Sequence, residues 1–315
     1  MNIKNKLKKN PYAVYIRDQM NFRKGKRFAE RYDDYSAICL LYKKKLGAQL
    51  SLDNPIRYSE KLQWLKLFYR DPLIETCTDK YTAREYIEKT HSELLNELLG
   101  VYDSMDDIDF DSLPSQFVLK ATHGSGWNLI CRDKSKLNWK AWKRVFNNRL
   151  KHDIYVYGRE WNYKNLKPRI IVEKYMEDDS GELRDYKIFC MNGTARFMLI
   201  EEGRFSNHHR AYIDRTGDNM GIRDSKPFLK EYFFGEVQGK MFELADELCK
   251  PFPHVRIDFY LCNDNIYFGE FTFFNDSGFA KYEPDSADDL IGGMLMLPEP
   301  NYNLDLLNNI LPRKC

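Results

Sequence analysis

The alternation of apolar and polar residues is clearest between residues 253 and 278, where it predicts a β-hairpin. The first expected strand has an apolar residue at every second position, the period of a half-buried strand; these residues are Val255, Ile257, Phe259 and Leu261. Residues 263–265, Asn-Asp-Asn, supply turn chemistry. A second strand is expected from 266 to 273, so the chain folds back on itself here.

Two acidic residues meet across this hairpin if its loop is three residues long. Asp258 then faces Glu270, and Arg256 faces Thr272. Directly opposed carboxylates repel each other and weaken the pairing. A compensating cation removes the repulsion, and a hard metal ion with oxygen ligands is the simplest one. Two other interpretations stay open: one acid is solvated, or another loop length places the acids on opposite faces.

Periodicity and turn signals elsewhere predict a chain that mixes helices and strands. The first fifty residues favour helix, and further helices are expected from Ser59 until Pro72 stops the pattern, and over 78–90, 135–151 and 238–250. Strands are expected at 117–120, 127–131, 168–176, 184–191 and 196–202, the last two joined by Asn192-Gly193, a strong hairpin signal. Residues 203–235 are expected to be mostly loop.

The composition is that of a globular protein with two or three lobes, because 315 residues are too many for one small core. A net charge of +2, from 49 basic and 47 acidic residues, argues against a general nucleic-acid binder. The seven cysteines have no zinc-site spacing, so reduced thiols in a cytoplasm are expected. No apolar run approaches the length of a membrane span. The basic N-terminus, MNIKNKLKKNPY, lacks the core of a signal peptide. Its lysines either touch an anionic membrane or a polyanion or, as in most such charge runs, form a solvated tail.

A glycine-containing loop between two expected strands is a candidate phosphate flap. Lys120 ends the first strand, and His123-Gly-Ser-Gly126 follows. Glycines let backbone N–H groups approach anionic oxygens, and Ser125 adds a hydroxyl. The order differs from a P-loop, because the lysine precedes the glycines. An ordinary hairpin turn is the alternative interpretation.

Further candidate residues lie at strand ends and in the later loop. Asp185 and Lys187 share one face of an expected strand, which in most proteins is simply a solvent-facing surface. His208 and His209 suggest a metal ligand or a base but have no third ligand nearby in sequence, so they are interpreted as loop residues near a substrate.

Several segments, taken in order, resemble the ATP-grasp superfamily and in particular its TupA-like (teichuronopeptide-biosynthesis) family. The segments are NPIRYSEKLQWLKL, DKY, FVLKATHGSG, VEKYM, DYKIFCMNG, VRIDFY and FGEFTF, which together span about residues 50 to 300. The resemblance implies an α+β ATP-grasp fold, with the nucleotide held between two lobes that contain antiparallel sheets. It implies a helical N-terminal region (1–79), a central lobe with the flap (80–172) and a C-terminal lobe with the metal site (173–315).

The resemblance also implies a set of ATP-binding residues. Lys80 and Lys120 match two phosphate-binding lysines, and Lys187 matches a third, catalytic one. The flap comprises His123, Gly124, Ser125 and Gly126, and the adenine hinge comprises Glu173, Lys174 and Met176. Either Glu182 or Asp185 corresponds to the ribose ligand.

The same resemblance implies a Mg²⁺ site and a catalytic arginine. Asp258 and Glu270 match the metal ligands, and Arg256 matches a residue that contacts the γ-phosphate or the reacting acyl group. Many ATP-grasp enzymes have Asn two residues after the metal glutamate, whereas this chain has Thr272. Asn275 or a water molecule is expected to take that place.

The activity implied is ADP-forming ligation of a carboxylate to an amine through an acyl phosphate. The substrates implied are a uronic-acid sugar or nucleotide-sugar and an amino acid or small amine, in bacterial surface polysaccharide biosynthesis. A cytoplasmic location, possible peripheral contact with the inner face of the membrane and no nucleic-acid partner complete the expectation. The alternatives are an ATP-grasp kinase or peptide ligase, a non-catalytic ATP-sensing scaffold, and a glycosyltransferase, for which Asp107-Ile108-Asp109 has the metal-motif pattern.

Overall fold

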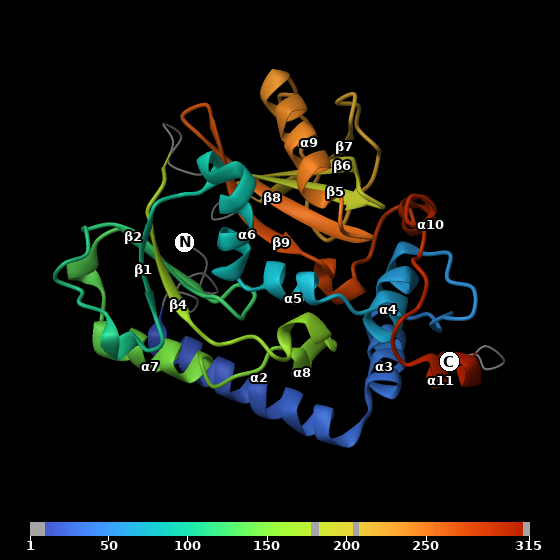
Figure 1. Cartoon of the computed structure of the whole chain (residues 1–315), viewed down its shortest axis with the longest axis horizontal. Helices are drawn as coiled ribbons and strands as arrows, with labels where there is room; N and C mark the ends of the chain where they lie inside the picture. The colour runs from blue at the N-terminus through green and yellow to red at the C-terminus, as the bar shows by residue number, and fades with distance from the viewer. Residues whose placement is uncertain (1–9, 178–182, 204–207, 311–315) are drawn as a thin grey trace. The chain divides into compact units, whose positions relative to one another are not determined.

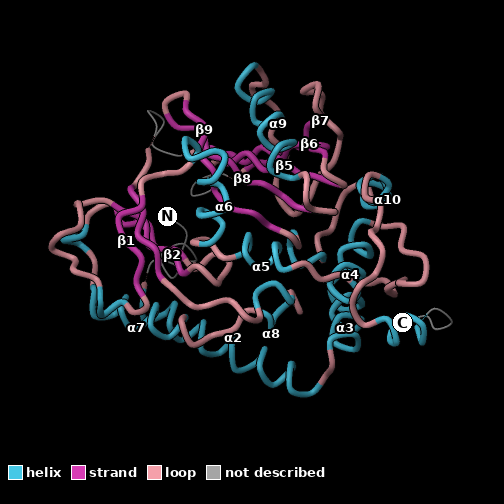
Figure 2. Tube along the Cα trace, viewed as in Figure 1, coloured by secondary structure: helices cyan, strands magenta, loops and turns pink. Residues whose placement is uncertain are grey.

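The computed structural model describes residues 10–177, 183–203 and 208–310. Within them the chain forms two compact units. Unit 1 comprises Met1–Asp33, Glu75–Thr90 and Leu95–Met176, and unit 2 comprises Asp34–Ile74, His91–Leu94 and Glu177–Cys315. Each unit has its own antiparallel sheet and helices (Figure 2), so the expected α+β class is confirmed. The expected three-part division stays a prediction.

Unit 1 contains an antiparallel sheet with strand order β1-β4-β2-β3. The strands are β1 (Leu98–Tyr102), β2 (Phe117–Ala121), β3 (Asn128–Cys131) and β4 (Ile170–Lys174). The strands β2, β3 and β4 were predicted, because each is rich in apolar residues. β1 was not predicted: its side chains are half-buried along its whole length, so it has no alternation to detect.

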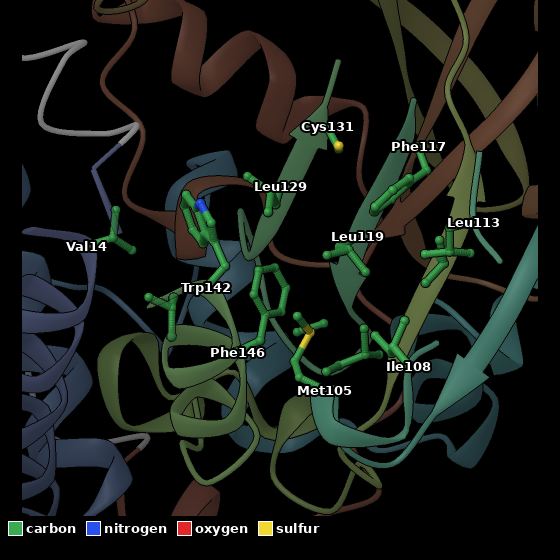
Figure 3. Close-up of a cluster of buried hydrophobic side chains, with 14 residues drawn as sticks. Val14, Met105, Ile108, Leu113, Phe117, Leu119, Leu129, Cys131, Trp142 and Phe146 are labelled. Carbon is green, nitrogen blue, oxygen red and sulfur yellow. The ribbon is translucent and has the colours of Figure 1, made fainter. Parts of the chain in front are cut away.

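The core of unit 1 lies between this sheet and two helices, α2 (Pro11–Arg31) and α7 (Trp139–Arg149). Figure 3 shows the buried cluster, in which Val14 of α2 joins Trp142 and Phe146 of α7. The two helices lie side by side (Figure 1). The side chain of Asn10 caps α2 by accepting hydrogen bonds from the N–H groups of residues 12 and 13.

Unit 2 contains an antiparallel sheet with strand order β7-β6-β5-β8-β9. The strands are β5 (Arg184–Met191), β6 (Thr194–Glu202), β7 (His209–Asp214), β8 (His254–Cys262) and β9 (Asn265–Thr272). Helix α9 (Glu236–Cys249) packs on the strands β5, β6 and β8 (Figure 1). The expectation of loop at β7 was wrong. This strand buries only a short stretch, residues 211–213, which is flanked by polar residues and was therefore not recognised as a strand.

The β8–β9 hairpin has the predicted pairing but a different loop. Asp258 pairs with Glu270 and Arg256 with Thr272, as expected. The turn, however, has two residues, Asn263 and Asp264, both with left-handed φ angles. A bulge at Gly269 adds the missing residue and restores the register. A Cβ at position 269 would lie 2.9 Å from the Asp258 carbonyl oxygen, so glycine fits best there.

The remaining helices of the described residues are shorter than α2. The α-helices are α3 (Asp34–Leu46), α4 (Tyr58–Phe68), α5 (Pro72–Thr78), α6 (Thr82–His91), α8 (Tyr155–Gly158), α10 (Ser286–Gly293) and α11 (Leu304–Ile310). The 3₁₀ turns are η1 (Ser92–Leu94), η2 (Met105–Asp107), η3 (Lys134–Lys136), η4 (Trp161–Tyr163) and η5 (Asn275–Gly278). None of the helices in the described ranges has the length and apolar character that a membrane crossing needs.

His254 is a buried histidine that links α4 to the β8–β9 hairpin. Its Nδ1–H donates to the Phe273 carbonyl at 2.8 Å, and its Nε2 accepts from the Tyr58 hydroxyl at 2.8 Å. Both ring nitrogens are thus satisfied in the neutral tautomer. Burial lowers the pKa of His254 to about 4.

We therefore expect unit 2 to lose stability as the pH falls. The neutral ring of His254 is favoured only in the folded state, so its contribution is complete above the unfolded pKa of about 6.5 and declines toward pH 4. Between pH 7 and pH 5 this loss is about 2 kcal/mol. Equilibrium denaturation of the wild type and of His254→Gln at both pH values measures it. The variant should lose less stability than the wild type over this interval; an identical pH dependence would contradict the assignment.

Candidate nucleotide and metal site

In unit 1, Lys120 and Glu173 form a buried ion pair between neighbouring strands. The Lys120 Nζ lies 2.6 Å from one oxygen of Glu173, and the Arg84 guanidinium lies 2.8 Å from the other. Burial alone would raise the pKa of Glu173, but the two cations outweigh it and hold the pKa below its usual range. Arg84, on α6, was missed by the sequence analysis because nothing in its helix marks it as a partner of a distant strand.

The flap residues divide into a buried base and an exposed tip. His123 is buried, and its Nε2–H donates to the Arg149 carbonyl at 3.1 Å. Burial lowers the pKa of His123, which keeps its ring neutral. Ser125 and Gly126 are exposed, and Gly126 has a left-handed φ of +67°. The geometry thus leaves the tip, rather than the histidine ring, available to an anionic ligand.

Lys80 contacts this loop directly. Its Nζ donates to the Gly124 carbonyl at 2.9 Å, and its backbone N–H donates to the Thr122 carbonyl at 3.2 Å. Lys80 and the flap were both expected, from the resemblance, to contact the phosphates of ATP. The structure brings the Lys80 side chain into contact with the flap.

The hinge segment at the end of β4 is held in place by residues of the segment just before β1. The Lys174 N–H donates to the Glu97 carbonyl at 3.0 Å, and the Lys174 carbonyl accepts from the Asn96 side chain at 2.8 Å. A carbonyl has two lone pairs, so that of Lys174 retains capacity for a further donor such as an adenine amino group. Met176 follows two residues later, at the end of unit 1.

In unit 2, Lys187 on β5 is surrounded by carboxylates. Its Nζ lies 3.2 Å from Asp185, 2.9 Å from Glu201 and 3.7 Å from Asp258. Strand register explains the arrangement: Lys187 pairs with Asp258, and Asp185 pairs with Glu201. The charged face expected for this strand is therefore buried against partners rather than solvated. Glu182, the other candidate ribose ligand, lies outside the described residues.

Arg256 connects Asp258 to the loop after β9. Its guanidinium donates to both Asp258 oxygens, at 2.6 and 2.8 Å, and to the Thr272 hydroxyl at 3.1 Å. It also donates to the Asn275 side-chain oxygen. Burial raises the pKa of Asp258, while Arg256 and Lys187 oppose that rise. The protein itself thus supplies part of the positive charge that the opposed acids require.

The donor set around Asp258 suits a hard divalent cation. Two carboxylates, Asp258 and Glu270, and the amide oxygen of Asn275 are the oxygen ligands that Mg²⁺ accepts. Asp258 and Asn275 already contact Arg256, so a cation would share their oxygens with that residue. No group of three or more His, Cys, Asp or Glu side chains suited to a metal occurs in the described ranges. Thr272, which stands where many ATP-grasp enzymes have Asn, accepts a hydrogen bond from Arg256.

The charged face continues across β6 to β7 through residues that the sequence analysis assigned to a loop. Arg210 contacts Glu201 and Asp224, and the Tyr212 hydroxyl donates to Asp224 at 3.0 Å. His208 Nε2 lies 3.5 Å from Glu201. The signal that could have revealed this arrangement is the alternation of Arg210 and Tyr212 with buried apolar residues.

Two buried residues of α4 hold the turn that carries Asn275. Lys66 is 1% exposed, and its Nζ donates to the Ser277 carbonyl at 2.6 Å and to Gln63 at 3.1 Å. Gln63 donates to the carbonyls of Ser277 and Gly278, at 3.1 and 2.8 Å. Asp276 and Ser277 have left-handed φ angles of 48° and 55°, so this turn needs such external support.

Comparison of the chain with models of protein families identifies its class and its family. The chain is an ATP-grasp protein. It belongs to the TupA-like ATPgrasp family, whose model matches residues 60–296. The resemblance seen in the sequence motifs is thereby confirmed. No curated protein matches the chain.

Solved structures of several ligases and synthases are similar at low sequence identity. A D-alanine-D-alanine ligase from Helicobacter pylori gives a TM-score of 0.43 at 11% identity, over 70% of this chain and 63% of that one. The corresponding ligase from Bacillus anthracis, complexed with ATP, gives 0.39 at 14% identity, over 77% and 65%. N5-carboxyaminoimidazole synthase from Aspergillus clavatus gives 0.39 at 10% identity, over 64% and 45%. The chain thus spans less than two thirds of the length of each.

Replacing Glu173 by Gln should destabilise unit 1. The change leaves Lys120 and Arg84 facing each other without the buried charge that both contact, and breaking such a pair costs about 3–5 kcal/mol. Glu97→Gln is the matched control, because Glu97 pairs with Lys174 at the surface, with both side chains more than half exposed. Its expected effect is below about 1 kcal/mol. Chemical denaturation measures both, and equal effects would contradict the buried-pair assignment.

Replacing Lys66 by Met should weaken the turn that carries Asn275. The Ser277 carbonyl and the Gln63 oxygen lose a donor inside the protein, which lowers the free energy of unfolding by about 1–3 kcal/mol. Lys45→Met is the control, since Lys45 is exposed and contacts the ring of Phe279, as Lys66 does. Denaturation curves that move equally for both variants would show that contact with the ring, rather than the hydrogen bonds, matters.

Proposed function

We propose that this protein is an ATP-dependent ligase that joins a carboxylate to an amine and releases ADP and phosphate. The observation that carries the proposal is the group formed by Arg256, Asp258, Glu270 and Lys187, which lies on one face of the unit 2 sheet. Membership in the ATP-grasp class supports it. A group of opposed acids and two cations on rigid strands is suited to holding a triphosphate and stabilising charge during its transfer.

We infer the following roles for ATP binding. In unit 1, Lys80, Lys120 and the flap residues His123, Gly124, Ser125 and Gly126 serve the phosphates, with the exposed tip making the contacts. The hinge residues Glu173, Lys174 and Met176 serve the adenine, chiefly through backbone groups. In unit 2, Lys187 serves the phosphates, and Asp185 or Glu182 serves the ribose. The buried pairs described above support these roles by fixing the lysines in place.

The reaction is proposed to have two steps. In the first, a carboxylate oxygen of the substrate bonds to the γ-phosphorus while the bond to the β–γ bridging oxygen breaks, which gives an acyl phosphate and ADP. In the second, the amine nitrogen bonds to the acyl carbon, phosphate leaves, and the nitrogen loses a proton to solvent. Lys187 and Arg256 stabilise negative charge on the transferred group, and closure of the flap keeps water away.

Mg²⁺ would neutralise the β- and γ-phosphates, and the residues proposed to hold it are Asp258, Glu270 and Asn275. Arg256 has a second task at this position, because it orients Asp258 and Asn275 with hydrogen bonds from the same guanidinium. The chain thereby holds its oxygen donors in a fixed orientation before any ligand arrives, which limits the entropy lost on binding.

The proposed substrates are a uronic-acid sugar or nucleotide-sugar and an amino acid or small amine, in a bacterial surface polysaccharide pathway in the cytoplasm. The arrangement of Arg210 with His208 beside the Lys187 face supports an anionic acceptor. Arg223 is exposed and belongs to the same segment. Arg210 places positive charge next to Lys187, because both residues contact Glu201.

Asp258→Asn and Glu270→Gln should each abolish turnover while the protein stays folded. Each change removes a carboxylate proposed to bind Mg²⁺, the ion that would balance the negative charge of the phosphates. A well-placed electrostatic contact of this kind is worth about 3 kcal/mol or more in the transition state, above a hundredfold in rate. ADP release in the presence of ATP, Mg²⁺ and panels of uronates and amines measures it. Asp264→Asn and Glu243→Gln are controls that make the same chemical changes at exposed positions. Full activity in the first pair would contradict the site.

The same assay distinguishes the remaining functions. ADP release that requires both a carboxylate and an amine supports the ligase, whereas a stable phosphorylated product supports a kinase. Extension of a peptide chain supports a peptide ligase. Release of UDP from a nucleotide-sugar supports a glycosyltransferase, and the absence of any turnover supports an ATP-sensing scaffold.

A further inference from the structure

The N-terminal helix α2 is firmly attached to unit 1 along one side. The Arg149 Nε donates to Asp18 at 2.8 Å, and the ring of Phe22 stacks on that of His152 with centroids 3.9 Å apart. A Cβ on Gly25 would lie 2.9 Å from Val156, so the helix approaches α8 closely there. Arg159 donates to the Tyr32 carbonyl at 2.6 Å and fixes the far end. α2 is thus a rigid part of the unit, although it precedes the matched residues 60–296.

The opposite side of α2 exposes apolar side chains at a spacing of four residues. Tyr12, Ile16 and Met20 expose 57%, 58% and 66% of their surface. Residues four apart lie on one face of an α-helix, so the three form a continuous stripe. Burial at Val14 and Asp18, on the other side, shows that the stripe is not part of the core.

The same face becomes basic beyond Met20. Arg23, Lys24, Arg27 and Arg31 are exposed, and the helical period of 3.6 places them in line with the apolar stripe. We call this surface the α2 face; it comprises Tyr12, Ile16, Met20, Arg23, Lys24, Arg27 and Arg31. Residues 1–31 contain ten Lys or Arg and two Asp or Glu, a net charge of +8. The whole chain has +2, so the other 284 residues carry −6.

We propose that the α2 face docks on an anionic lipid membrane. An apolar stripe next to clustered lysines and arginines is the combination that interfacial helices use: the apolar side chains enter the headgroup region while the cations meet anionic lipids. A nucleic acid would use the cations but would leave the stripe against a charged backbone. A second copy of this face would bring like charges together. The segregation of charge also orients the molecule, because the remainder of the chain is repelled by the same surface.

Sedimentation of the full chain with lipid vesicles tests the proposal. Binding is expected to vesicles that contain phosphatidylglycerol, with little binding to vesicles of phosphatidylcholine alone, and it should weaken as salt rises from 50 to 500 mM. The double variant Arg23→Gln/Arg27→Gln should lower the partition coefficient about 25-fold, since each basic residue near such a surface contributes about fivefold. Lys240→Gln/Lys250→Gln is the matched control on exposed residues of unit 2 and should bind as the wild type does.

A second pair of variants tests the apolar stripe separately. Ile16→Ser/Met20→Ser should weaken binding even at low salt, whereas Leu290→Ser/Met296→Ser, at residues that are 52% and 68% exposed, should not. Equal binding to both kinds of vesicle, or loss of binding in both controls, would overturn the proposal. Self-association in light scattering that disappears with Ile16→Ser/Met20→Ser would assign the face to a second copy instead. Tighter binding to duplex DNA than to anionic vesicles would also overturn it.

Discussion

The pairing of Asp258 with Glu270 across the β8–β9 hairpin is the constraint on which the candidate site in unit 2 depends. Two carboxylates side by side in a buried sheet are unfavourable unless cations lie close to them. Two cations lie close to Asp258: Arg256 contacts both of its oxygens, and Lys187 lies on the neighbouring strand. These cations in turn need partners, and Glu201 and Arg210 extend the alternation of charge to β7. The charged residues of this face are thus linked from β9 to β7.

The same logic explains why distant elements contain buried polar residues. Arg256 also contacts Asn275, whose turn contains two residues in left-handed conformations. Such a turn persists only where its surroundings hold it. Lys66 and Gln63 provide that support from α4, a helix whose side chains are almost all buried. A lysine inside a hydrophobic helix, which is unfavourable by itself, is therefore stabilised by the carbonyls that the turn presents.

Sequence reasoning succeeded where a local pattern determines the structure. Alternation and turn residues gave the β5–β6 and β8–β9 hairpins, and the predicted pairing of Asp258 with Glu270 is confirmed, although a bulge at Gly269 compensates for a shorter turn. Strands without alternation, such as β1, gave no signal. The partners Arg84 and Lys66 could not be predicted, because their contacts join residues that only the tertiary fold brings together. The predicted roles of the site residues toward ATP and Mg²⁺ stay predictions.

Both units hold a lysine in place with buried carboxylates, and this shared arrangement bears on the proposed role of these lysines. Lys120 is fixed by Glu173, and Lys187 is fixed by Asp185 and Glu201. A long side chain fixed in this way loses little further entropy when a phosphate arrives, so its position is prepared in advance. The carboxylates also neutralise part of its charge, which weakens attraction to phosphate. An ammonium group has three N–H donors and can serve a carboxylate and a phosphate together. In the proposed site, selectivity would depend on geometry: a ligand would approach along the direction that the acids leave open, and an anion of another shape would meet their repulsion.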